Sequence, residues 1–222
     1  AAWLTIVGLA AWSSLEAAAA WSLQPSLPET VYWGQWAPNL GFLEQFKGTV
    51  LGAAVGSDSL PPGRLPVSDR LRDQLLQNAG PVTAQVITGD PPDDLAPIVS
   101  VFDRRSTEIF LLGQRRDAAF FRLRTRASDL KLRPPAIRIR NAVPQTPGES
   151  LAFAASYARG QYRLRVAAEG QTVQRTLDAS PNWAWSYFMP FENFALDDEV
   201  GWLTALWVGG LLLPIGYWAG RS

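Results

Sequence analysis

Seven arginines alternate with apolar residues in three short segments of the sequence. They are Arg122, Arg124, Arg126, Arg138, Arg140, Arg163 and Arg165. Side chains along a β-strand point alternately to its two faces, so this spacing predicts an apolar face in the core and a basic face opposite. If the three segments neighbour each other, guanidinium groups gather where they could bind phosphate, carboxylate or an acidic subunit. The alternative is a solvated face that nearby Asp and Glu residues balance.

Groups that carry out catalysis are scarce in the 222 residues, which include no His and no Cys. This composition excludes Ser-His-Asp triads, cysteine nucleophiles, disulfides and the usual ligation of haem or chlorophyll. The sequence has no P-loop, no Rossmann glycine pattern and no G-x-S-x-G elbow. The acidic residues Asp90, Asp93 and Asp94 lie in a Pro-rich loop, which we interpret as solvated rather than as a Ca²⁺ site. We therefore expect no enzymatic activity, no catalytic residue, no metal and no intrinsic cofactor.

The elements that must position these arginines are short strands between turn residues. Alternating apolar residues predict strands at 82–88, 98–102, 107–112, 119–125, 136–140, 151–157, 162–166 and 172–177. Hairpin turns are expected at 158–160 and 168–170, and a short helix near 68–78. Several short strands at this spacing are typical of an antiparallel sandwich. We therefore predict an all-β domain over residues 47–180.

Two blocks of this region resemble laminin-G-like, concanavalin A-like domains. The first block combines IVSVFD at 98–103, EIFLLGQ at 108–114 and FFRLRT at 120–125, and the second is the hairpin from 151 to 173. The resemblance covers roughly residues 80–180 and implies a jelly-roll sandwich of two antiparallel sheets. The acidic E-x-D-x-E strand motif of the family's glucanases is absent. Segments 188–191 and 213–218 are similar to bacterial proteins that join such a domain to VanZ-like membrane helices.

Tryptophan and charge separate the two ends of the chain from its middle. All ten Trp lie in the end regions: Trp3, Trp12, Trp21, Trp33, Trp36, Trp183, Trp185, Trp202, Trp207 and Trp218. Residues 47–180 hold 19 basic and 13 acidic residues, a net charge of +6, and the ends carry the balancing −6. We interpret the ten Trp as residues that contact the membrane interface or a partner.

The apolar ends predict two transmembrane helices. Residues 200–218 contain no charge, and as a helix they extend roughly 28 Å, close to the thickness of a bilayer's hydrocarbon core. Residues 1–23 predict a less regular span, for which a processed signal peptide is the alternative. The aromatic segments 24–46 and 181–199 are expected at the interface. Arg221 places the C-terminus in the cytoplasm and the central domain in the periplasm, at a bacterial inner membrane.

These patterns favour a non-enzymatic accessory subunit of a larger bacterial membrane complex. Its β-sandwich would brace or cap other integral membrane subunits, and a photosynthetic reaction-centre–antenna complex is the host that we hypothesise. Lipid or pigment contacts would then come through partners. An acidic subunit or an anionic surface could bind the basic face, whereas no nucleic-acid partner is expected because the middle segment lacks an aromatic–basic stacking platform.

The alternative function is a membrane-tethered module that recognises carbohydrate or the cell envelope. Such a module would carry exposed aromatic residues on the loops of its sandwich, whereas every Trp lies in the end regions. The Trp distribution therefore favours the accessory subunit.

Overall fold

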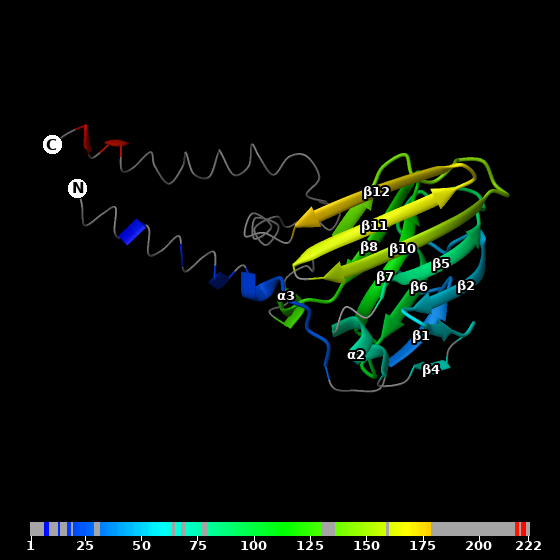
Figure 1. Cartoon of the computed structure of the whole chain (residues 1–222), viewed down its shortest axis with the longest axis horizontal. Coiled ribbons are helices and arrows are strands. Elements are labelled where there is room, and N and C mark those ends of the chain that lie inside the picture. The colour runs from blue at the N-terminus through cyan, green and yellow to red at the C-terminus, as the bar shows by residue number, and fades with distance from the viewer. Residues whose placement is uncertain are drawn as a thin grey trace.

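The computed structural model describes residues 7–8, 13, 17–18, 20–28, 32–63, 65–67, 70–76, 80–129, 136–158, 160–178, 216–217 and 219–220. The strands among them form an all-β sandwich of two six-stranded sheets (Figure 1). Every pair of neighbouring strands is antiparallel. The strand order is β4-β1-β6-β7-β8-β9 in the sheet that we call sheet 1, and β12-β11-β10-β5-β2-β3 in sheet 2.

The elements have the following bounds. Sheet 1 contains β1 (Tyr32–Trp36), β4 (Leu65–Val67), β6 (Ala96–Phe102), β7 (Glu108–Arg115), β8 (Ala118–Leu123) and β9 (Ala136–Ile139). Sheet 2 contains β2 (Thr49–Val55), β3 (Asp58–Leu60), β5 (Val82–Ile87), β10 (Ser150–Ala158), β11 (Gln161–Ala168) and β12 (Gln171–Asp178). Two short helices, α2 (Arg70–Leu76) and α3 (Arg126–Asp129), lie at the edge of the sandwich.

The eight strands predicted from alternation are confirmed as β5 to β12, and α2 lies within the helix predicted near 68–78. The two hairpin turns of sheet 2 are also confirmed, since β10, β11 and β12 follow each other with short connections. Gly160 and Gly170 adopt φ angles of 81° and 75° in these connections. Other residues are strained in this left-handed region, so the two glycines allow the chain to reverse.

The core lies between the two sheets and is built from the inward residues of the alternating strands. Phe121 of β8 lies 6.5 Å from Phe110 of β7 and 6.5 Å from Tyr162 of β11, measured between ring centroids. All three side chains are fully buried. These aromatic contacts join the two sheets across the core, where burying large apolar side chains is the main driving force for folding.

The expectation that 24–46 is an interfacial connector is wrong for part of this segment. Residues 32–36 form β1, which pairs with β4 on one side and β6 on the other. Tyr32 is only 1% exposed and belongs to the core, together with Leu23 and Leu27. Aromatic residues suit a half-buried strand as well as a membrane interface, so their presence could not distinguish the two.

Most of the predicted membrane segments lie outside the described residues. This applies to 181–199, to most of 1–23 and to nearly all of 200–218. In the part of the chain that the structure describes, no helix combines the length and apolar character needed to cross a membrane.

Candidate functional site

The seven predicted arginines do not share one face. A common basic face requires that the strands carrying the arginines neighbour each other. Strands β8 and β9 meet this requirement, since they pair and place Arg122 and Arg138 on the same side of sheet 1. Arg163 and Arg165 lie on β11 in sheet 2, so the sandwich separates them from the first pair. Arg124, Arg126 and Arg140 follow the ends of their strands or lie in α3. The alternation of arginine with apolar residues predicted which face of its strand each side chain occupies. It did not predict which of the two sheets each strand belongs to.

Arg122 is neutralised within sheet 1. Its Nε donates to Glu108 Oε1 at 2.6 Å and its Nη2 to Glu108 Oε2 at 2.7 Å, and both side chains are mostly buried. Burial disfavours the charged guanidinium, but the attraction and the hydrogen bonds of Glu108 outweigh it and raise the pKa of Arg122. This paired geometry is the strongest form of a charged hydrogen bond in proteins. Arg122 therefore supports the fold rather than offering a free cation.

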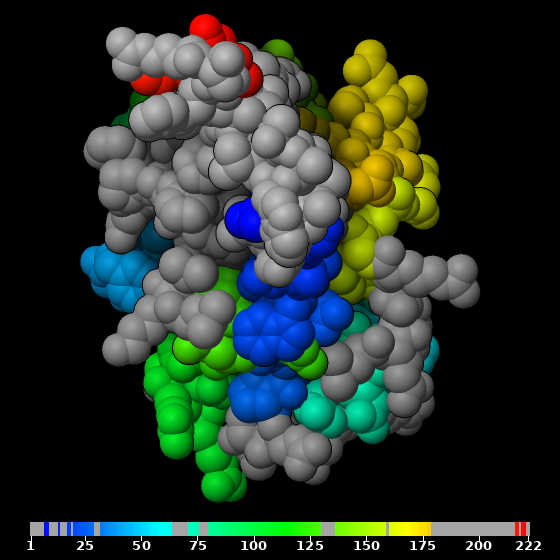
Figure 2. Space-filling model, turned by 90° about the vertical axis from the view of Figure 1, so that its left-hand side faces the viewer, coloured from blue at the N-terminus to red at the C-terminus, as the bar shows by residue number. Residues whose placement is uncertain are grey.

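Two further arginines hold the N-terminal segment against the sandwich. Ser26 Oγ donates to Asp129 Oδ2 at 2.6 Å, and Ser26 N donates to the carbonyl of Arg124 at 3.2 Å. Arg126 N donates to the carbonyl of Gln24 at 2.9 Å. We call these contacts between residues 21–28 and 124–129 the N-terminal clamp. Figure 2 shows the blue N-terminal residues lying directly against the green residues of this region.

Side chains reinforce the N-terminal clamp. The Arg126 guanidinium carbon lies 4.9 Å from the centroid of the Trp21 ring, within the range of a cation–π contact. Arg124 pairs with Asp129 at 3.0 Å and lies 3.6 Å from the buried Asp103. The clamp therefore fixes the position at which the N-terminal segment enters the domain.

Three of the ten Trp lie among the described residues. Trp21 is 44% exposed beside Arg126, whereas Trp33 stacks on Phe102 and its indole nitrogen donates to the carbonyl of Asp103 at 3.0 Å. Trp36 packs against the core, and its buried Nε1 has no hydrogen-bond partner. The remaining seven Trp lie outside the described residues. Of the three, Trp21 alone has a large exposed surface with which to contact a membrane or a partner.

The acidic loop at 90–94 lies in the connection from β5 of sheet 2 to β6 of sheet 1. Asp94 N donates to Glu44 Oε2 at 2.9 Å, and Arg115 Nε lies 3.4 Å from Asp94 Oδ1. The hydrogen bond from the Asp94 backbone, aided by Lys47, lowers the pKa of Glu44. Asp90 and Asp93 are exposed. Among the described residues, no three His, Cys, Asp or Glu side chains form a group that could hold a metal ion.

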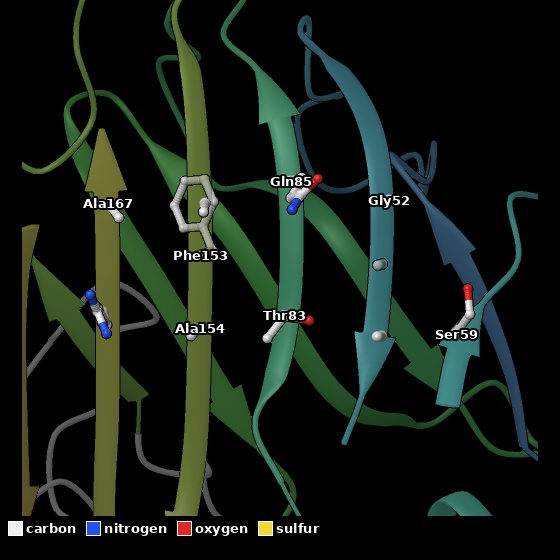
Figure 3. A pocket seen from close by; sticks show the side chains of 11 residues that line it. Gly52, Ser59, Thr83, Gln85, Phe153, Ala154 and Ala167 are labelled. Carbon is white, nitrogen blue, oxygen red and sulfur yellow. The ribbon is translucent and has the colours of Figure 1, made fainter. Parts of the chain in front are cut away.

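A groove with a volume of about 530 Å³ crosses the outer face of sheet 2 (Figure 3). Mostly small residues from five adjacent strands line it: Gly52, Ala53, Ala54, Ser59, Thr83, Gln85, Ala152, Phe153, Ala154, Arg165 and Ala167. Pairing between strands arranges the outward members of this set in two rows. Sequence analysis missed this site, although alternate Gly and Ala in 52–54 and alternate Ala in 152–154 form its floor.

Arg165 provides the charge of the groove. Its side chain is exposed, and among the described residues it forms no ion pair and no hydrogen bond. The neighbouring Arg163 donates from Nη2 to Gln161 Oε1 at 3.2 Å. The eleven described residues that line the groove include Arg165 and no Asp or Glu, so this part of the lining carries a positive charge. Thr83 and Gln85 add a hydroxyl and an amide, which can hydrogen-bond to a ligand.

The groove cannot be interpreted from relatives. Comparison of the chain with protein-family models, with curated proteins and with solved structures found no match.

Proposed function

We propose that this chain is a non-enzymatic accessory subunit of a bacterial membrane complex. Its β-sandwich, which we assign the jelly-roll connectivity of laminin-G-like domains, docks a partner protein through the outer face of sheet 2. A transmembrane helix before residue 21 and another at 200–218 anchor it, with the sandwich in the periplasm; the predicted span 1–23 is shortened because Leu23 belongs to the core of the sandwich. The apolar, charge-free stretch at 200–218 supports the anchor.

The observation that carries the docking proposal is a difference between the two outer faces. On sheet 1, Ser100 and Leu111 point away from the core and are nevertheless fully buried. On sheet 2, Gln85, Ala152 and Arg165 occupy outward positions and are exposed. Sheet 2 therefore offers the open surface on which a partner can pack, and the small residues of its groove allow close approach.

The N-terminal clamp supports an anchored role. It fixes residues 21–28 to the sandwich by backbone hydrogen bonds as well as side-chain contacts. An anchor that precedes residue 21 would then hold the domain in a defined orientation. A fixed orientation lowers the entropic cost of docking to a neighbouring subunit in the same membrane.

A carbohydrate-binding module is the second candidate, favoured by Thr83, Gln85 and Arg165, which can hydrogen-bond to sugar hydroxyl groups. Among the described residues that line the groove, the only aromatic one is Phe153, and this side chain is 2% exposed. It offers no open ring face on which a sugar could stack. For this reason we place protein docking first.

Purification from native membranes in mild detergent tests the proposal. We expect one or more integral membrane proteins to co-migrate with the chain at fixed stoichiometry, as mass spectrometry would identify. The absorption spectrum of that complex would show whether its host is photosynthetic. A chain that migrates alone and binds immobilised envelope polysaccharide would support the second candidate instead.

A further inference from the structure

The groove runs across the strands of sheet 2 and not along them. Backbone pairing aligns its outward residues in two rows, Arg165–Ala154–Thr83–Ala54–Ser59 and Ala167–Ala152–Gln85–Gly52. Neighbouring strands lie about 4.8 Å apart, so five strands span roughly 19 Å. An extended peptide advances about 3.3 Å per residue, so about six residues would cross the full width.

The floor of the groove lets a peptide backbone approach closely. Ala54, Ala152, Ala154 and Ala167 present only methyl groups, and Gly52 presents none. A Cβ atom added at Gly52 would meet no atom within 4 Å, so the space above this position is open. If the bound peptide had bulky side chains facing the floor, they would hold its backbone away from the sheet. The groove therefore favours a peptide with small side chains on that face.

Charge distinguishes one end of the groove from the other. Arg165 ends the first row on β11, and Ser59 ends it on β3. Arg163 lies two residues from Arg165 on the same side of β11, about 7 Å away along the strand. A guanidinium group binds a carboxylate through two parallel hydrogen bonds, and neither row contains an acidic residue that competes for Arg165.

We propose that the groove binds an extended, acidic segment of the partner protein, about six residues long. Small side chains of this segment face the floor, its backbone bonds to Thr83 and Gln85, and a carboxylate pairs with Arg165. This inference rests on the proposed docking function and specifies the partner's surface. An inorganic phosphate or a lipid headgroup would occupy only the Arg165 end and leave the rest of the floor uncovered.

Site-specific cross-linking in native membranes tests the inference. Because the chain has no Cys, Ala152→Cys introduces a single thiol on the groove floor that can carry a photo-cross-linker. We expect the cross-linked partner peptide to contain Asp or Glu beside Ala, Gly or Ser. Added acidic hexapeptide of that sequence should compete for cross-linking, whereas inorganic phosphate and oligogalacturonate at the same charge concentration should not.

Charge reversal provides the matched comparison. The double variant Arg163→Glu, Arg165→Glu should lower both cross-linking and co-purification by roughly tenfold or more. The control variant Arg104→Glu, Arg105→Glu makes the same charge change at exposed positions in the connection between β6 and β7. This control variant should still cross-link to the partner and co-purify with it. Circular dichroism should confirm that both variants fold.

The outcomes separate the two proposals. If a partner co-purifies with the native chain but survives the Arg163 and Arg165 reversal, the inference is wrong and the docking function stands. The inference is also wrong if the cross-linked species is a glycan, a lipid or a peptide without acidic residues. If no protein co-purifies with the native chain, the docking function itself is wrong.

Discussion

The two sheets share one core, but their outer faces differ in side-chain size and in exposure. Every residue of β6 in sheet 1 is buried. Large residues such as Phe102, Leu111 and Arg122 occupy outward positions on β6, β7 and β8 of this sheet. The outward positions of sheet 2 carry mostly Ala, Gly, Thr and Gln. Substitutions on the outside of sheet 1 should therefore change stability, whereas those on sheet 2 should change binding. Three comparisons can break or sharpen this distinction, and a fourth experiment titrates the core that the two sheets share.

Leu111→Ala should have the largest effect. Leu111 points away from the core but is fully buried, so its truncation should cost about 2–5 kcal/mol of unfolding free energy, as in a core. Gln85→Ala, at an exposed outward position of sheet 2, should stay within about 0.5 kcal/mol of the native value. Urea unfolding measures both. If Leu111→Ala and Gln85→Ala both lowered the free energy of unfolding by a similar small amount, the outer face of sheet 1 would be open in solution.

Glu108→Gln should cost about 2–3 kcal/mol, between the typical values for exposed and fully buried ion pairs. The substitution keeps the shape of the side chain but leaves the mostly buried Arg122 without its counter-charge. The sheet 2 counterpart is Arg165→Gln, which removes an exposed charge without a partner among the described residues and should leave stability nearly unchanged. The distinction fails if the two variants unfold at the same urea concentration.

Tyr32 should make stability depend on alkaline pH. Burial raises its pKa to about 12, whereas an unfolded tyrosine titrates near 10. Below pH 10 both states keep the proton, and between about pH 10 and 12 the unfolded state releases it first. The fold should therefore lose on the order of 2 kcal/mol across this window.

Unfolding midpoints measured across the alkaline range, together with tyrosinate absorbance, test this prediction for Tyr32. Tyr32→Phe should remove this part of the pH dependence. It should also lower stability at neutral pH, because the hydroxyl donates to the carbonyl of Pro28 at 2.7 Å. A pH dependence that persists unchanged in Tyr32→Phe would assign the loss to other groups.

Gly52→Val should have the smallest effect on stability and a large one on docking. A Cβ atom at this position meets no atom within 4 Å, and valine suits a strand better than glycine, so we expect a gain of about 0.5 kcal/mol. The same side chain would block the groove and reduce partner co-purification.

Gly113 on the outer face of sheet 1 is the matched control for Gly52. A Cβ atom there would lie 2.7 Å from the carbonyl oxygen of Ala96, so Gly113→Ala should destabilise the fold by about 1–3 kcal/mol. Thermal unfolding compares the two glycines. A stabilising Gly113→Ala would contradict the close packing of sheet 1.

Alternation was sufficient to predict strands that carry large apolar residues on one face. It failed for β2, whose sequence TVLGAAV is rich in small residues, and for β3 and β4, which are only three residues long. It failed for β1 because YWGQW combines the aromatic residues of a strand with those of a membrane interface. Strand prediction depends on side-chain contrast, which these segments lack.

The groove could not be predicted from the sequence, for a different reason. Ala and Gly have no side chain that signals binding, and their importance arises from what strand pairing places beside them. The register puts Ala54, Thr83, Ala154 and Arg165 in one row, although they lie more than a hundred positions apart at the extremes. Local sequence cannot give the order of strands, so it showed neither the row nor the separation of the arginines between two sheets.

The N-terminal clamp also constrains the order of events during synthesis. Ser26 and Asp129 are 103 residues apart, so their hydrogen bond cannot form until residue 129 has left the ribosome. Until then residues 21–28 lack the partners in 124–129 that hold them against the sandwich. A nascent chain therefore completes the strands from β1 to β8 before the clamp can hold residues 21–28, which separates the synthesis of the early strands from the formation of the clamp in time.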